Sequence, residues 1–247
     1  MWNDVFDLRD FYAGAKGRLA ARLISNRIRD MWPDLTGRRL LGIGFPAPFL
    51  GNYRSEAERV IAVMPAGQGA LRWPEGQKNL TVLSDEHMLP FEDRSMDRLL
   101  LVHCLEGSSH LQPLLRECWR VLSDGGRLLV IVANRRGLLA QSESSPFALG
   151  RPYSAGQITR LLKDNLFVPV QTKGFLYALP VGWRLFRTWS VILERLGGRI
   201  FPAFGGLLAV EAEKQIYALP FGGAKEKTPP RGVIARPVGG GIRRNYL

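Results

Sequence analysis

Residues 81–102 read T-V-L-S-D-E-H-M-L-P-F-E-D-R-S-M-D-R-L-L-L-V, and residues 114–134 read L-L-R-E-C-W-R-V-L-S-D-G-G-R-L-L-V-I-V-A-N. Two runs within them, residues 98–102 and 127–133, continue after an initial arginine without any polar alternation. Strands of a parallel sheet have this pattern when helices cover both of their faces. We therefore expect a buried strand at each run.

The chain between these two runs has the spacing of an amphipathic helix. Its apolar residues recur at intervals of three and four, and they are Leu111, Leu114, Leu115, Cys118, Val121 and Leu122. Arg116, Glu117 and Arg120 fall on the other face. A strand, a helix and a second strand in this order predict a right-handed crossover. Residues 124–126 (D-G-G) are expected to end the helix, because glycine accepts the left-handed backbone required there.

The order of these residues resembles that of a known family. The string D-E-x-x-L-P-F-x-D-x-S-x-D-R starts at Asp85, and L-L-R-E-x-x-R-V-L-x-x-G-G-R-L-L-V follows from Leu114. Together they look like the second half of a class I S-adenosylmethionine-dependent methyltransferase of the type 11 group, and the resemblance spans about residues 36–175. It implies an α/β fold, a Rossmann-like doubly wound sheet of seven strands. Such a sheet is mostly parallel, with an antiparallel last strand.

Three parts are expected along the chain. Residues 1–35 form an N-terminal helical cap, with one helix over residues 5–31 that a Trp-Pro pair ends. Residues 36–222 form the methyltransferase-like domain. Within it, the aromatic segment 180–204 is a helical insertion before the last strand. Residues 223–247 form a basic tail that is rich in Gly and Pro and is interpreted as disordered.

Further elements follow from local patterns. Residues 38–50 contain the first strand and the loop after it, and residues 59–64 form the second strand. Ser154 begins a helix with a capping box. Residues 167–179 and 206–217 form an antiparallel pair at the edge of the sheet.

The loop after the first strand departs from the family pattern. The family has an acidic residue and then a G-x-G-x-G turn, whose backbone amides approach the methionine part of the cofactor. Here Gly42 stands in place of the acid, Gly44 matches the first glycine, and Pro46 and Pro48 replace the other two. Proline has no N–H, so this turn cannot hold a ligand in the usual way. Phe45 is expected to pack over the pocket.

The next two strands keep one of two expected contacts. Met64 ends the second strand where the family has an acid for the ribose, and Gln68 is the nearest polar substitute. Asp85 matches the aspartate that accepts from the adenine amino group, although an Asp after a strand also caps turns. The residues that the resemblance assigns to S-adenosylmethionine are Gly42, Gly44, Phe45, Met64, Asp85, Glu86 and His103.

His103 is also the candidate general base. It ends the fourth strand, at the carboxyl edge of the sheet where ligands bind, and its reference pKa of about 6.5 suits proton removal. Structural histidines also occupy strand ends. Tyr12, Arg135, Arg151 and Tyr153 are the candidate substrate-binding residues, because arginines there would hold an anionic substrate. A solvated loop with locally paired arginines is the alternative.

The composition limits which other classes of protein this chain can belong to. The formal net charge is +12, and the tail carries six Lys or Arg residues against Glu226. Cys104 and Cys118 lie in apolar elements without a disulfide framework or a metal-ligand spacing, so we expect a reducing cytoplasm and no metal. The N-terminal sequence does not have the pattern of a signal peptide. Glu194, Arg195 and Arg199 make a membrane-spanning helix over residues 189–210 costly.

Two functions compete. One is an S-adenosylmethionine-dependent methyltransferase that acts on an unknown small-molecule or protein acceptor. The other is a methyltransferase-like protein that has lost catalysis and binds a protein partner, through residues 180–204. The chain also resembles a bacterial subgroup of the family whose first motif is similarly altered and whose members are associated with neighbours of the glyoxalase II type. That resemblance implies a protein partner, with such a hydrolase as the candidate. A methyltransferase that binds RNA or a membrane surface through its basic tail is a third, less favoured interpretation.

Overall fold

The computed structural model describes residues 2–137, 146, 147, 149–176 and 205–216. Met1–Ile216 forms one compact unit, and residues 217–247 form a second unit that lies outside the described residues. The predicted insertion at 180–204 and the basic tail at 223–247 also lie outside them. Among the described residues, no helix combines the length and the hydrophobicity needed to cross a bilayer.

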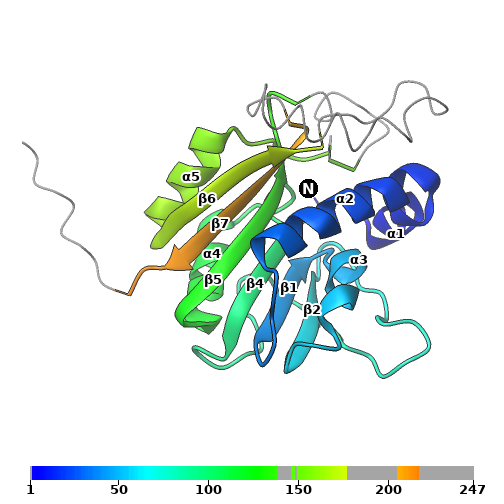
Figure 1. The fold of residues 1–247 in the computed structure, drawn as a ribbon, viewed down its shortest axis with the longest axis horizontal. Helices are drawn as coiled ribbons and strands as arrows, with labels where there is room; N and C mark the ends of the chain where they lie inside the picture. Colours follow the sequence, from blue (N-terminus) through cyan, green and yellow to red (C-terminus); the bar gives the residue numbers. More distant parts are fainter. Residues whose placement is uncertain (1, 138–145, 148, 177–204, 217–247) are drawn as a thin grey trace, which may run out of the picture. The chain divides into compact units, whose positions relative to one another are not determined.

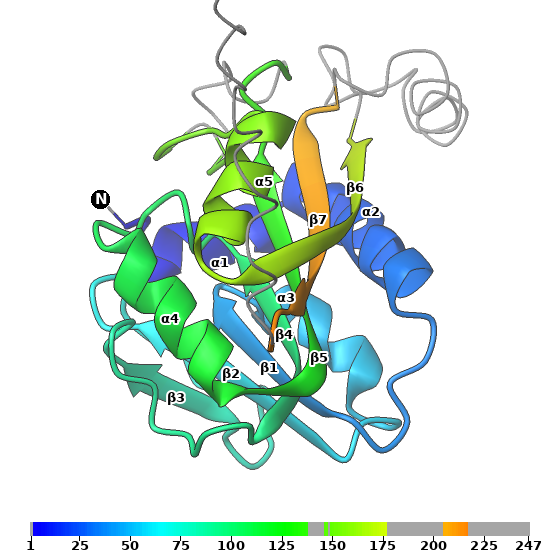
Figure 2. The ribbon, with the colours of Figure 1, turned by 90° about the vertical axis from the view of Figure 1, so that its left-hand side faces the viewer.

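The sheet has seven strands in the order β3-β2-β1-β4-β5-β7-β6 (Figure 1; β3 is labelled in Figure 2). The strands are β1 (Arg39–Gly44), β2 (Arg59–Pro65), β3 (Thr81–Ser84), β4 (Met96–Val102), β5 (Leu122–Ala133), β6 (Phe167–Phe175) and β7 (Leu207–Lys214). The first five are parallel, whereas β7 is antiparallel to both β5 and β6. This arrangement confirms the predicted fold class, including the antiparallel pair at the edge. The chain therefore has the fold of class I methyltransferases.

Helices cover both faces of the sheet (Figure 2). They are α1 (Val5–Ala13), α2 (Ala15–Met31), α3 (Ala47–Leu50), α4 (Leu111–Val121) and α5 (Ala155–Asp164). A short 3-10 turn, Gly51–Tyr53, follows α3. Two hydrophobic clusters result, one between the sheet and α1, α2 and α3, and the other between the sheet and α4 and α5. The N-terminal helices thus share the core of the domain.

The N-terminal helical region is two helices, although one continuous helix over 5–31 was predicted. The chain turns at Gly14, which has an extended backbone and ends α1. A Cβ atom built on Gly17 would lie 1.9 Å from the Phe11 carbonyl oxygen, so α2 can approach α1 this closely only because residue 17 has no side chain. The apolar periodicity of 15–31 predicted α2 correctly, but it carries no signal for the bend.

The end of α4 also differs from the prediction. The helix stops at Val121, and its cap residue Leu122 already has an extended backbone. The D-G-G sequence instead belongs to an irregular start of β5, where the register shifts between Met96 and Arg98 of the neighbouring strand. Gly125 has φ +71°, a left-handed backbone conformation that favours glycine. The glycine is needed for a left-handed residue, but that residue lies after the helix.

Arg120 fixes the loop between β3 and β4. Its guanidinium donates to the carbonyl oxygens of Leu89 and Phe91 and to the carboxylates of Asp93 and Glu117, at 2.7–3.0 Å. Glu117 in turn accepts the Leu89 N–H at 2.8 Å. Hydrogen bonds to charged groups are stronger than neutral ones. The L-P-F segment is therefore held on α4 by one residue pair.

We expect Arg120→Ala to lower the free energy of unfolding by about 2 kcal/mol, because two carbonyls and two carboxylates lose a charged partner. Arg116→Ala on the exposed face of the same helix is the matched control and should change stability by less than about 0.5 kcal/mol. Urea denaturation of both variants measures the difference. Equal denaturation midpoints for the two variants would show that the hydrogen bonds of Arg120 do not stabilise the fold.

Candidate functional site

The carboxyl ends of β1, β2, β3, β4 and β5 meet at one edge of the sheet. Open α/β sheets bind their ligands at this edge, because the loops there diverge to opposite faces. All of the predicted cofactor residues lie in these strands or in the loops that follow them. The candidate site is therefore built strand by strand.

The turn after β1 is tightly closed. Gly44 has φ +96°, and a Cβ atom there would lie 2.2 Å from the Val102 carbonyl oxygen. Phe45 donates its N–H to that same oxygen at 2.9 Å. Behind the turn, a Cβ atom on Gly42 would lie 2.4 Å from Pro46 Cβ. Both glycines are required by packing within the protein itself.

This turn offers few amides to a ligand. The N–H groups of Phe49 and Leu50 both donate to the Pro46 carbonyl, at 2.9 and 3.2 Å. Pro46 and Pro48 have no N–H. A ligand at this turn would therefore meet fewer free amides than a G-x-G-x-G turn provides.

Aromatic rings fill the space above this turn. Tyr12 from α1 stacks on Phe45 with ring centroids 5.9 Å apart and meets Phe49 edge-on at 5.6 Å. His103 lies on the other side of Tyr12 and stacks on Phe147 at 4.3 Å. Phe45 and Phe49 are both buried, as expected for residues that pack over the edge. Tyr12, the candidate substrate residue, thus belongs to a packed aromatic cluster.

His103 is buried within this cluster. Burial lowers the pKa of His103 to about 3, and its Nε2 atom shares a hydrogen bond of 2.7 Å with the Tyr12 hydroxyl. Burial, and then the charge of Glu106, raises the pKa of Tyr12 well above its usual value. Both groups are therefore neutral near pH 7. An imidazole with so low a pKa is a weaker base than the sequence prediction assumed.

Glu106 carries the stronger proton-accepting character at this edge. Its Oε1 atom accepts the Ala133 N–H at 3.1 Å, and its Oε2 atom has no partner among the described residues. Burial raises the pKa of Glu106 to about 7, although backbone hydrogen bonds oppose the shift. A buried carboxyl that titrates near neutral pH at a strand end is typical of functional sites.

The loop after β5 closes around Glu106. Tyr153 donates its N–H to the Ala133 carbonyl and accepts the Arg135 N–H, and its hydroxyl donates to the Leu105 carbonyl at 3.3 Å. Arg151 donates its N–H to the Glu106 carbonyl at 3.2 Å. The structure therefore brings Arg135, Arg151 and Tyr153 together. Tyr153 is buried, whereas both arginine side chains are exposed.

The loop after β2 buries an amide. Met64 is fully buried, and its sulfur accepts the Leu71 N–H. Gln68 is only 2% exposed, and both its Oε1 and its Nε2 atoms have no partner within the described residues. Buried polar groups are normally hydrogen-bonded, so an amide with two unpaired atoms is a candidate partner for a bound water or a polar ligand. Gln68 stands where the family has its ribose acid.

The loop after β3 separates two neighbouring acids. Asp85 has an exposed side chain, and it accepts the backbone N–H and contacts Nδ1 of His87 at 2.6–2.9 Å. Glu86 is buried, its Oε1 atom accepts the Ser108 hydroxyl at 2.9 Å, and its Oε2 atom has no described partner. Burial raises the pKa of Glu86 and hydrogen bonding to His87 lowers that of Asp85. Of the two predicted residues, Glu86 is the better placed for an enclosed ligand.

Glu106 and Phe147 were not among the predicted site residues, and Gln68 was considered only as a substitute for the missing acid. Glu106 follows β4 directly, so its position at the ligand edge was readable. Its burial was not, because that depends on the chain around Tyr153. The described residues contain no group of three or more His, Cys, Asp or Glu that could hold a metal ion.

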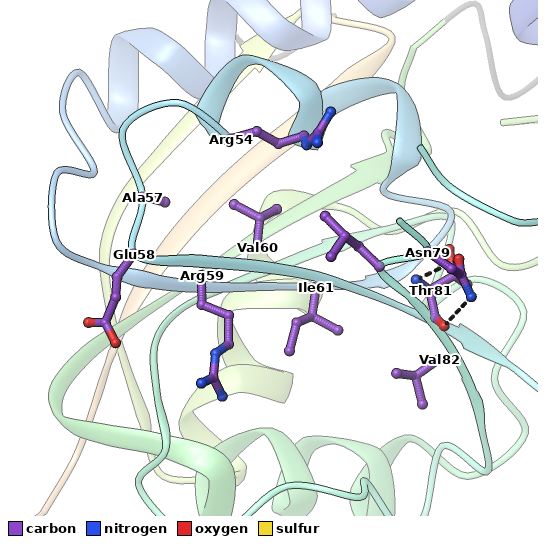
Figure 3. A pocket seen from close by; sticks show the side chains of 10 residues that line it. Arg54, Ala57, Glu58, Arg59, Val60, Ile61, Asn79, Thr81 and Val82 are labelled. Atoms are coloured by element: carbon purple, nitrogen blue, oxygen red, sulfur yellow. Dashed lines mark hydrogen bonds between the residues drawn. The ribbon is translucent and has the colours of Figure 1, made fainter. Parts of the chain in front are cut away.

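A separate cavity of about 470 Å³ lies at the opposite edge of the sheet (Figure 3). Among its lining residues, Arg54 and Val60 lie on one side of the β2 ribbon and Ile61 and Val82 on the other. Asn79 is occupied within the protein, since its side chain bonds to Thr81. The cavity is formed where β2 begins before its neighbour β3. Its position at the amino ends of the strands separates it from the candidate site.

Comparison with known proteins agrees with the fold. The model of the methyltransferase domain family matches residues 41–130. A demethylmenaquinone methyltransferase of Tropheryma whipplei is 43% identical over 53 residues. That match covers 22% of this chain and 22% of the relative, so the chain spans about a fifth of the length of the curated relatives that it matches.

Solved structures share the architecture at low identity. A SAM-dependent methyltransferase from Archaeoglobus fulgidus has a TM-score of 0.58 and 22% identity, over 78% of this chain and 94% of that one. An S-adenosylmethionine-dependent methyltransferase from Mesorhizobium loti has a TM-score of 0.55 and 14% identity, over 82% and 99%. The [4+2]-cyclase SpnF has a TM-score of 0.56 and 18% identity, over 81% and 84%. These likenesses show the fold.

We expect Glu106→Gln to remove a pH dependence of stability. The folded pKa of about 7 exceeds the ordinary value of 4.5, so the folded protein holds the proton more tightly. Stability from this group is complete below about pH 4.5 and falls as the pH rises through 7, by about 3 kcal/mol in total.

Urea denaturation at several pH values between 5 and 8 measures this effect as the difference between the wild type and Glu106→Gln. His103 contributes the opposite slope, because its pKa is lowered, but it is present in both proteins and cancels. Parallel stability profiles for the two proteins would contradict the assigned titration of Glu106.

Proposed function

Since residues 41–130 carry a methyltransferase domain and the sheet has the class I order, we propose that this chain is an S-adenosylmethionine-dependent methyltransferase. The observation that supports it is the row of buried, unpaired polar atoms on Gln68, Glu86 and Glu106. These residues follow β2, β3 and β4 in turn. A nucleoside with two hydroxyls and an amino group would supply the missing partners.

The nucleoside end of the cofactor fits the residues present. Gln68 can accept from one ribose hydroxyl and donate to another, because an amide has both functions. Glu86 can accept from the adenine amino group through its unpaired Oε2 atom. Leaving such groups buried without partners costs about 1–3 kcal/mol each, so a ligand that pairs them gains affinity.

The methionine end fits less well, because the turn after β1 has no amide cradle. When bound, S-adenosylmethionine supplies an activated methyl group on its sulfonium. This chain's residues would then orient the acceptor and remove its proton. Glu106 is the candidate base, since its pKa of about 7 suits a proton acceptor at neutral pH. Arg135, Arg151 and Tyr153 border it and are the proposed acceptor-binding residues.

The packed aromatic cluster supports a second candidate. Tyr12, Phe45 and Phe49 occupy the place above the first turn, which favours a methyltransferase-like protein that binds a nucleoside without catalysis. Such a protein would act through a protein partner, with a glyoxalase II type hydrolase as the proposed one. The methyltransferase is preferred because the buried Glu106 carboxyl, although Oε1 accepts the Ala133 N–H, keeps Oε2 without a partner among the described residues at the edge where an acceptor would bind.

Calorimetry with S-adenosylhomocysteine and with adenosine tests both functions. We expect micromolar binding of S-adenosylhomocysteine and weaker binding of adenosine. Glu86→Ala should weaken both by about tenfold, which corresponds to one lost hydrogen bond to a charged group. Asp85→Ala is the matched control, and its neighbouring but exposed carboxyl should be dispensable.

Three results are informative. Equal affinities for the two ligands would favour the non-catalytic nucleoside-binding protein, because the amino-acid end then adds nothing. A loss in Asp85→Ala with none in Glu86→Ala would restore the role predicted for Asp85 from the sequence. If neither ligand gives a heat of binding with the wild type, nor with a variant in which the site is open to ligands, the result argues against both functions.

A further inference from the structure

The first residues of the chain lie in the candidate site. Trp2 contacts two glycines, one in the loop after β2 and one in the loop after β4. A Cβ atom built on Gly67 would lie 2.7 Å from Trp2 Cδ1, and one built on Gly107 would lie 2.8 Å from Trp2 Cε3. The indole therefore lies between the two loops with part of the residue exposed, and any side chain at position 67 or 107 would collide with it.

Several further bonds hold this segment, residues 2–13, which we call the N-terminal arm. Asn3 donates its side-chain amide to the Pro146 carbonyl at 3.0 Å, and Val5 donates its N–H to the Gln68 carbonyl at 3.0 Å. The far end of the arm is fixed by Tyr12, which bonds to His103. The arm thus spans the loops after β1, β2, β4 and β5.

The slot that Trp2 fills has the features of a purine site. Gly67 and Gly107 form two of its walls, and the next residues along the chain are Gln68, whose side-chain amide has no partner among the described residues, and Ser108, which donates to Glu86. Indole and adenine are both flat, fused bicyclic rings of similar size. The polar groups near the slot could bind a nucleoside, whereas the Trp2 indole has a single N–H group and cannot form hydrogen bonds with all of them.

We infer that the Trp2 indole occupies the nucleobase slot and that the N-terminal arm is an internal competitor of the nucleoside. This inference rests on the proposed function. The arm must withdraw before adenine enters, and withdrawal exposes Trp2 to solvent. The affinity for a nucleoside is then reduced by the fraction of molecules in which the slot is open.

Trp2→Ala tests the competition. If the arm is seated in about nine of ten molecules, the variant should bind adenosine and S-adenosylhomocysteine about tenfold more tightly than the wild type. Phe6→Ala is the matched control, because Phe6 lies on α1 in the same arm with 52% of its surface exposed. Its affinity should equal that of the wild type.

A second measurement follows the indole directly. The protein contains six tryptophans, so it is labelled with 5-fluorotryptophan, and the Trp2 resonance is assigned by its absence in Trp2→Phe. Saturation with S-adenosylhomocysteine should move the fluorine resonance of Trp2 toward that of exposed fluorotryptophan. The resonances of Trp32 and Trp119, which bond to Glu211 and to the Gln215 carbonyl, should stay in place.

The outcomes separate the two ideas. Tighter binding in Trp2→Ala together with a shifted Trp2 resonance supports the competitor. Binding that is unchanged in Trp2→Ala, or an unshifted Trp2 resonance at saturation, overturns the competitor and leaves the proposed function standing. Absence of binding in the wild type, Trp2→Ala and Phe6→Ala alike overturns the proposed function and the competitor together.

Discussion

The contact between the ends of β1 and β4 determines the rest of the edge. Gly44 approaches the Val102 carbonyl so closely that no side chain fits, and Phe45 donates its N–H to the same oxygen. This geometry turns Phe45 toward Tyr12, and Tyr12 in turn bonds to His103. This turn therefore helps to fix the far end of the N-terminal arm, at Tyr12.

The site has two unlike halves. Toward β2 and β3, the buried side chains of Gln68 and Glu86 retain hydrogen-bonding capacity that the protein does not use. Toward β1, prolines and aromatic rings fill the space and make apolar contacts with one another. Ligand affinity in such a site would come from the nucleoside, whereas the remainder of the cofactor would have to compete with packing.

The apolar run at residues 127–133 predicted a buried strand correctly, the resemblance to the methyltransferase family implied the seven-stranded sheet, and the Ser154 capping box was confirmed. The sequence did not predict the bend at Gly14 or the irregular start of β5 at Gly125. The presence of a glycine alone does not identify the backbone conformation that it adopts. The burial of Glu106 depends on the Tyr153 segment, which is distant in the chain. Local sequence patterns do not predict contacts between residues that are distant in the chain.

The contacts of Trp2 with Gly67 and Gly107 limit how the sequence can vary among homologues. Residues 2, 67 and 107 are far apart in the chain, yet each limits what the other two can be, because the indole fits only between bare backbones. A homologue that acquires a side chain at either wall must lose the large ring at its start. These three positions should therefore change together during evolution, although they are spread over residues 2–107.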